Sequence, residues 1–145
     1  MSNNTSLKNH PLLYVSLTLN ALVVFPLFVL LIFFKPEYLI DRFGPDSEAR
    51  RILASIYFAI GVGSLTAIFL KGEQAIHMAF PIFYLQIIYK ITTVFTVGFP
   101  NPVVIANVAI SVLHLVTIFF VSKRQKAALN QKETNNKDEE SPAVE

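Results

Sequence analysis

The sequence predicts an all-α fold, a four-helix antiparallel bundle that spans a membrane. Three observations support this prediction. Hydrophobic residues make up 53% of the 145 residues, and the mean hydropathy is +0.52. Charged residues make up 15% of the chain, whereas soluble domains carry about a quarter. The charges gather in 35–51, 71–73 and 123–145, which leaves long apolar runs between them.

The first apolar run starts at Pro11 and predicts a transmembrane helix over about 12–34. At about 1.5 Å per residue, a helix of that length crosses the hydrocarbon core of a bilayer. The run is longer than the apolar part of a signal peptide, and no small-residue cleavage motif follows it. We therefore expect a membrane span preceded by a polar N-terminal tail over 1–10.

The segment 35–51 predicts a short amphipathic turn at the membrane interface, because apolar and charged residues alternate along it. Pro36 ends the first helix, and Gly44 ends the turn. Asp46 or Ser47 is placed to cap the next helix.

Three further spans are predicted at about 48–70, 75–97 and 102–122, separated by short turns. The four spans form one transmembrane domain over 11–124. Residues 125–145 are polar and show no apolar periodicity, so we expect a disordered C-terminal tail.

Each span except the second carries one stripe of polar residues on an apolar body. The stripes are expected to face inward, because a lipid-facing amide or ammonium is costly. In the third span Gln86 and Lys90 are one helical turn apart. The candidate ligand-binding residues are Asn20, Gln86, Tyr89, Lys90, Asn107 and His114.

Lys90 admits two interpretations. A structural ion pair with Glu37 is favoured, because both residues lie toward the same membrane surface and a lysine side chain can extend toward it. In the alternative, Lys90 lines a small polar cavity and attracts an anionic or carbonyl-bearing ligand, such as a quinone, a lipid or an organic anion.

Small residues recur at every fourth position of the second span, which lets another helix backbone approach closely. Packing inside the bundle is the favoured interpretation, and a homo-oligomer or partner-protein interface is the alternative. The residues of this stripe are Ser55, Ala59, Gly63 and Ala67.

Several classes of site are not expected. The chain has no cysteine, which excludes disulfides, thiolate metal sites and a cysteine nucleophile. No acidic residue lies in the interior of a span, so no intramembrane general base is available. His10, His77 and His114 lie at different depths, so we expect no metal site, no catalytic residue and no cofactor. The net charge is only +2, and the basic residues flank the spans, which indicates membrane topology and no nucleic-acid binding.

An even number of spans puts both termini on the same side of the membrane. Lys123, Arg124 and Lys126 follow the last span, and this basic cluster favours a cytoplasmic location for both termini.

The stretch FFKPEYLIDRFGPDSEARRILASIYFAIGVGSLTAIF resembles the DoxX-like proteins, a group of small four-helix bacterial membrane proteins. The shared features are a first span that closes in Pro, an amphipathic turn that ends near a Gly, and a second span that starts with an Arg. The matching residues are Pro36, Gly44, Arg51, Gly61 and Gly63. The resemblance implies the bundle fold and a bacterial inner membrane, and some members are associated with quinol-linked respiratory complexes. It implies no catalytic residue.

Three functions follow as hypotheses. The first is a non-enzymatic accessory or scaffold subunit in the membrane, which packs against a partner protein or against itself. The second is a binder or carrier of a small ligand, with a polar core around Lys90. The third, a subunit of a quinone-linked oxidoreductase, follows from the resemblance alone. A ligand binder requires a cavity beside Gln86 and Lys90, whereas a scaffold requires a filled core.

Overall fold

The computed structural model describes residues 10–34, 37–70 and 72–140, with the side chains of 137–140 outside that description. Every regular element in this part of the chain is a helix, which confirms the all-α prediction. The elements are α1 (Pro11–Val29) with a π-helical turn after it (Leu30–Phe34), α2 (Glu37–Phe43), α3 (Glu48–Phe69), α4 (Glu73–Thr96) and α5 (Pro102–Glu140).

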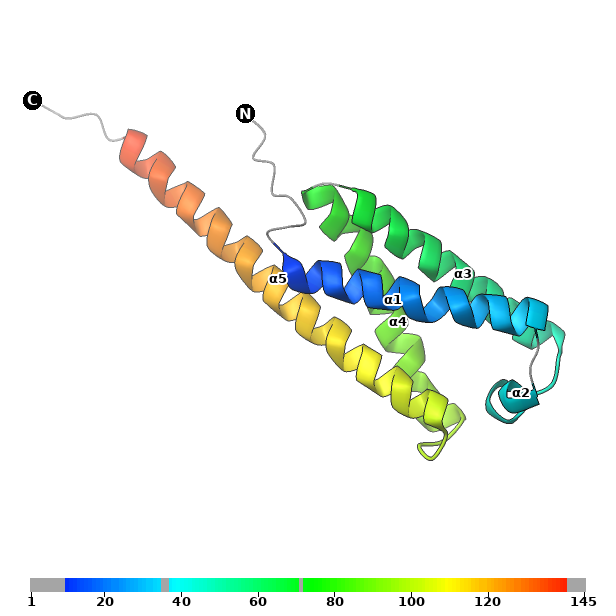
Figure 1. Ribbon diagram of the computed structural model, residues 1–145. Coiled ribbons are helices and arrows are strands. Elements are labelled where there is room, and N and C mark those ends of the chain that lie inside the picture. Colours follow the sequence, from blue (N-terminus) through cyan, green and yellow to red (C-terminus); the bar gives the residue numbers. More distant parts are fainter. Residues whose placement is uncertain (1–9, 35–36, 71, 141–145) are drawn as a thin grey trace, which may run out of the picture.

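Four of these helices are long and apolar enough to cross a membrane, and α2 is the short helix that follows the first of them. When the π-helical turn is counted with α1, the four helices start and end within two residues of the predicted spans, except at the end of α5. Consecutive spans run in opposite directions, so the start of α1 and the end of α5 lie at the same end of the bundle (Figure 1).

Two helix starts show how the sequence sets these boundaries. The hydroxyl of Ser47 accepts a hydrogen bond from the backbone N–H of Arg50 at 3.3 Å and caps α3. The side-chain oxygen of Asn101 accepts one from the N–H of Val103 at 2.8 Å, directly before the proline that opens α5. Ser47 was one of the two residues predicted to cap the second span.

The prediction of a disordered tail from residue 125 is wrong for residues 125–140. The backbone of α5 is helical through Glu140, and residues 141–145 lie outside the described part. The segment between Pro102 and Pro142 contains neither Pro nor Gly, and its Lys, Gln, Ala and Glu residues favour helix. The last helix therefore continues beyond its apolar part into a polar extension.

The bundle consists of two helix pairs. α1 packs mainly on α3, and α4 packs mainly on α5. The pairs meet near the start of α1 and separate toward α2 (Figure 1). We call the end at the start of α1 the closed end and the end at α2 the open end.

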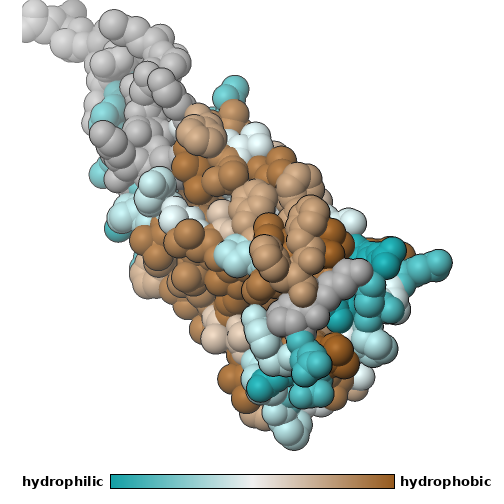
Figure 2. Space-filling view, turned by 45° about the vertical axis from the view of Figure 1, so that its right-hand side comes forward, coloured by the Kyte–Doolittle hydropathy of each residue, from teal (hydrophilic) through white to brown (hydrophobic). Residues whose placement is uncertain are grey.

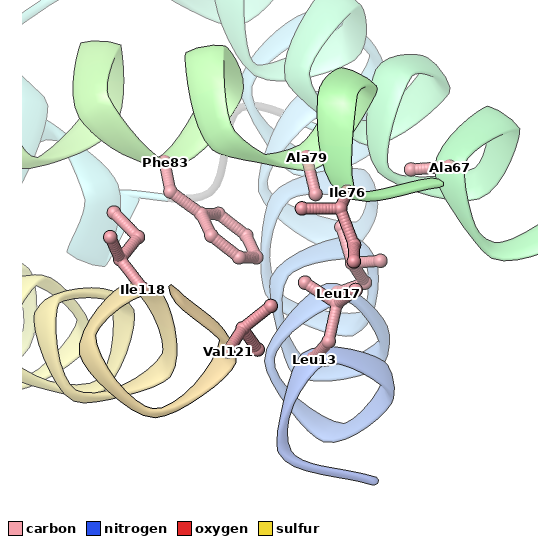
Figure 3. Close-up of a cluster of buried hydrophobic side chains, with 8 residues drawn as sticks. All are labelled: Leu13, Leu17, Ala67, Ile76, Ala79, Phe83, Ile118 and Val121. Carbon is pink, nitrogen blue, oxygen red and sulfur yellow. The ribbon is translucent and has the colours of Figure 1, made fainter. Parts of the chain in front are cut away.

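All four long helices contribute to the core of the closed end (Figure 3). The largest of its fully buried side chains is Phe83 of α4. The buried residues of this core are Leu13 and Leu17 of α1, Ala67 of α3, Ile76, Ala79 and Phe83 of α4, and Ile118 and Val121 of α5. The closed end is therefore packed across both pairs.

The core of the open end is built differently. Its buried residues come from α1, the π-helical turn, α2 and α3, and α4 reaches it through the half-buried side chains of Ile82 and Tyr89. The buried residues are Val24, Leu31, Leu39, Ala54, Tyr57 and Ile60. The α4–α5 pair therefore contributes none of the buried residues of this core and contacts it from α4.

The outer surface is apolar around the middle of the bundle. In Figure 2 hydrophobic residues cover the middle of the visible face, and hydrophilic residues gather toward its ends. Large apolar side chains such as Leu22 (67% exposed) and Phe95 (84% exposed) point outward. A soluble monomer rarely exposes a continuous apolar surface of this extent. The molecule is thus a multi-pass membrane protein, whose exposed apolar surface faces a lipid bilayer.

Candidate functional site

Lys90 lies near the open end, buried between the two last helices. It is six residues before the end of α4 at Thr96, and its side chain is only 3% exposed. Its Nζ donates a hydrogen bond to Oδ1 of Asn107 in α5 at 2.9 Å and lies 5.2 Å from the centre of the Tyr89 ring. The polar stripes of the third and fourth spans therefore face each other, as predicted.

The favoured partner of Lys90 was wrong. The ammonium bonds Asn107, and in the described residues it makes no ion pair with Glu37, whose side chain is exposed. Lysine extends toward a surface carboxylate only when its path is open. Here the side chain turns inward, toward an amide one helix away.

Further hydrogen bonds hold Asn107 in place. Its Nδ2 donates to the hydroxyl of Thr93 at 3.3 Å, and that hydroxyl in turn donates to the backbone carbonyl of Lys90 at 2.6 Å. Ser111, one turn along α5, donates to the carbonyl of Asn107 at 2.8 Å. The lysine and its acceptor thus form one connected polar group at the α4–α5 contact.

A pocket of about 330 Å³ opens beside this group, between α1, α2 and α5. Its lining is mostly apolar, with Lys90 and Asn107 on the inner wall and Arg42 of α2 as a further cation. Pockets for small molecules range upward from about 300 Å³ and combine apolar walls with a few polar groups. The ligand-binding hypothesis required a cavity beside Gln86 and Lys90, and this pocket meets the requirement at Lys90 and not at Gln86.

The remaining polar candidates lie farther from the open end than Lys90 does. His114 of α5 stacks on Phe83, with ring centroids 4.3 Å apart, and its Nδ1 hydrogen-bonds the hydroxyl of Ser16 at 2.8 Å. Asn20 of α1 donates from Nδ2 to the hydroxyl of Ser64 at 2.8 Å. These two bonds join α1 to α5 and α1 to α3, across the interior of the bundle.

Gln86 is fully buried, and neither atom of its side-chain amide has a hydrogen-bond partner among the described residues. The same holds for Nε2 of His114, Oδ1 of Asn20 and the hydroxyl of Tyr89. Buried polar atoms in folded proteins nearly always have a partner, and one without a partner requires an explanation. The interior therefore retains donors and acceptors that its own packing does not use.

All six predicted polar candidates turn away from lipid, and they form three separate groups. Lys90 bonds Asn107 and lies near the Tyr89 ring, Asn20 and His114 each pair with a serine, and the Gln86 amide has no partner among the described residues. The lining of the pocket includes Lys90 and Asn107 and none of the other four.

The small-residue stripe of α3 is divided. Gly63 and Ala67 are buried, and a Cβ at position 63 would lie 2.8 Å from Cδ1 of Ile82 in α4. Ser55 and Ala59 are exposed. The stripe therefore packs inside the bundle over its second half only, because α4 diverges from α3 toward the open end.

Sequence reasoning missed two contributors. Ser64 pairs with Asn20, and its place inside an apolar span was a signal that could have marked it. Arg50 is 3% exposed and donates to the backbone carbonyl of Gly44 at 2.9 Å. Arg50 therefore fixes the loop between α2 and α3.

Within the described residues there is no group of three His, Asp or Glu side chains that is placed to hold a metal ion. No protein-family model, curated protein or solved structure matches the chain. The resemblance to the DoxX-like proteins remains a prediction, and the function is argued from the geometry of the site.

Proposed function

We propose that this protein binds a lipophilic molecule with a carbonyl or anionic head group, in the pocket beside Lys90. One observation carries the proposal, an apolar pocket of about 330 Å³ with a buried lysine on its wall. It favours the second of the three hypotheses, a binder or carrier, over the first. A non-enzymatic role is part of the proposal.

The chemistry of Lys90 supports this choice. An ammonium has three N–H donors, and Asn107 is the one acceptor recorded for it in the described part of the chain. A buried charge without a counter-charge is costly. A carbonyl or carboxylate oxygen in the pocket supplies a further acceptor, so binding is stronger for such a head group than for a plain hydrocarbon.

The apolar lining of the pocket determines which apolar part of a ligand fits. α1 contributes Val23, Val24 and Leu27, and α5 contributes Val103 and Ile110. These aliphatic side chains suit a ring or an acyl chain, as in a quinone, a lipid or a hydrophobic organic anion. Arg42 lines the pocket from α2 and adds positive charge, which favours an anionic group.

A scaffold role is the second candidate, supported by the exposed half of the α3 stripe. Ser55 and Ala59 are exposed on α3, where a second copy or another membrane protein could pack closely. The oxidoreductase subunit rests on the resemblance alone. We also propose a bacterial inner membrane and cytoplasmic termini, from that resemblance and from the basic cluster after the last span.

The test is the variant Lys90→Met, examined by native mass spectrometry of gently extracted protein and by titration with decanoate and a short-chain quinone. We expect the wild-type protein to bind at least one probe and the variant to lose that binding. Thermal stability should stay equal or rise, because an apolar residue of similar length replaces a buried charge.

Ala59→Leu is the matched control, because it changes an exposed position on α3 away from the pocket. It should bind the probes like the wild type. If Lys90→Met lowers thermal stability and leaves probe binding unchanged, the lysine is a structural residue and the proposal fails. If Ala59→Leu alters the oligomeric state instead, the scaffold role is supported.

A further inference from the structure

A second pocket, of about 640 Å³, lies at the closed end, whereas Lys90 lies near the open end. It is formed by the start of α4 and by α5 from Ser122 to Lys132, where the helix leaves its apolar part. Its charged lining residues are Arg124, Lys126 and Lys132 as cations and Glu73 as the one acid, and His10 and His77 also line it. This lining is basic and lies where the apolar part of the bundle ends.

An apolar pocket of about 220 Å³ adjoins it, between the start of α1 and α5. The two pockets share His10 and Arg124 in their linings, and Leu12, Phe120 and Val121 are among the residues around the smaller one. A basic site and an apolar site therefore lie next to each other at the membrane boundary.

His10 lines both pockets and therefore lies where they adjoin. It is 7% exposed, and its Nδ1 has no hydrogen-bond partner in the described residues. Burial, and then the positive charge of Arg124, lower the pKa of His10 below its ordinary value. Among the described residues, a buried ring nitrogen without a partner thus lies at the junction of the basic and the apolar pocket.

We propose that the two pockets together bind an anionic phospholipid, with its phosphate among Arg124, Lys126 and Lys132 and one acyl chain in the smaller pocket. Arg and Lys are the side chains that bind phosphate groups. Basic pockets between transmembrane helices at the cytoplasmic surface are a known form of head-group site. The cytoplasmic position agrees with the topology that the basic cluster predicts.

The test uses the full chain in detergent micelles, titrated with phosphatidylglycerol, phosphatidylcholine and inorganic phosphate. We expect phosphatidylglycerol to bind more tightly than phosphatidylcholine. Lys126→Gln and Lys132→Gln should each weaken binding of phosphatidylglycerol about fivefold. Circular dichroism should show unchanged helix content, because both side chains are exposed on the polar part of α5.

Lys123→Gln is the matched control, because it removes the same charge from the same helix at a position outside both pocket linings. It should change binding of phosphatidylglycerol less than twofold, on the order expected for a screened surface charge. An equal loss in all three variants means general surface attraction and overturns the proposal.

Leu12→Trp separates a lipid from free phosphate, because it fills the smaller pocket at a half-buried position. It should weaken binding of phosphatidylglycerol and leave binding of inorganic phosphate unchanged. If inorganic phosphate binds as tightly as the lipid, or if Leu12→Trp has no effect on the lipid, the acyl chain has no role and the proposal fails.

Discussion

Both ends of the bundle bury polar residues among apolar side chains, but the two ends differ in how tightly the helix pairs pack around them. At the closed end all four long helices meet around Phe83, and His114 is enclosed by a stacked ring and a hydrogen bond to Ser16. At the open end Lys90 and Asn107 are also buried and bonded to each other, yet they line a pocket. The difference shows that buried polar residues of this bundle line a pocket where the helix pairs separate.

The separation has a visible cause in the helix contacts. Gly61 lets α3 approach α1 so closely that a Cβ there would lie 2.9 Å from the Phe25 ring. The buried alanines at positions 67 and 79 allow α3, α4 and the other helices to converge at the closed end. At the open end α2 supplies Leu39 to the core of the α1–α3 pair. The two pairs therefore share a core at the closed end, whereas at the open end α4 contacts the other core through half-buried side chains.

The largest effect is expected from Phe83→Ala. The side chain is fully buried, so its removal leaves a cavity and costs about 3–5 kcal/mol of unfolding free energy. Unfolding in mixed detergent micelles measures the loss.

The matched control is Phe95→Ala, at a ring that is 84% exposed to lipid. It should change stability by less than about 0.5 kcal/mol. Binding of the probes at Lys90 should be retained in both variants. Equal losses for the two rings would mean that the closed end is no better packed than the lipid-facing surface.

A smaller effect is expected from Gly61→Ala, at about 1–3 kcal/mol, because its new Cβ meets the ring of Phe25. Gly63→Ala should cost less than about 1 kcal/mol. Its Cβ meets Cδ1 of Ile82, the end of a flexible side chain that can move aside. The same unfolding assay ranks the two variants. The reverse order would show that the α3–α4 contact, and not the α1–α3 contact, is the tighter one.

The smallest effect concerns the bond between Ser16 and His114. A double-mutant cycle with Ser16→Ala and His114→Phe should give a coupling of about 0.6 kcal/mol, the typical size for side-chain hydrogen bonds inside membrane proteins. The cycle Lys90→Met with Asn107→Leu provides the comparison at the open end. A coupling of zero would mean that the hydrogen bond between Ser16 and His114 does not contribute to stability.

Much of the site was predictable from the sequence. Spacing alone indicated that Lys90 and Asn107 face inward, because only the bundle interior satisfies polar groups in hydrocarbon. The identity of the partner was not predictable. Glu37 was favoured by charge, whereas the structure pairs Lys90 with an amide that is 17 residues away in the chain. Helical periodicity defines the face of a helix, and it does not specify which residue of a neighbour lies opposite.

The sequence by itself determined the four spans, their helix starts and the inward direction of the polar stripes, since hydropathy, capping and periodicity are local properties. The absence of Pro and Gly also allows α5 to continue to Glu140. Only the tertiary structure decided which polar residues meet, where the α3 stripe loses its neighbour, and where pockets form. The physical reason is that these features depend on the distance between helices that are far apart in the chain, and this distance is set by packing across the whole bundle.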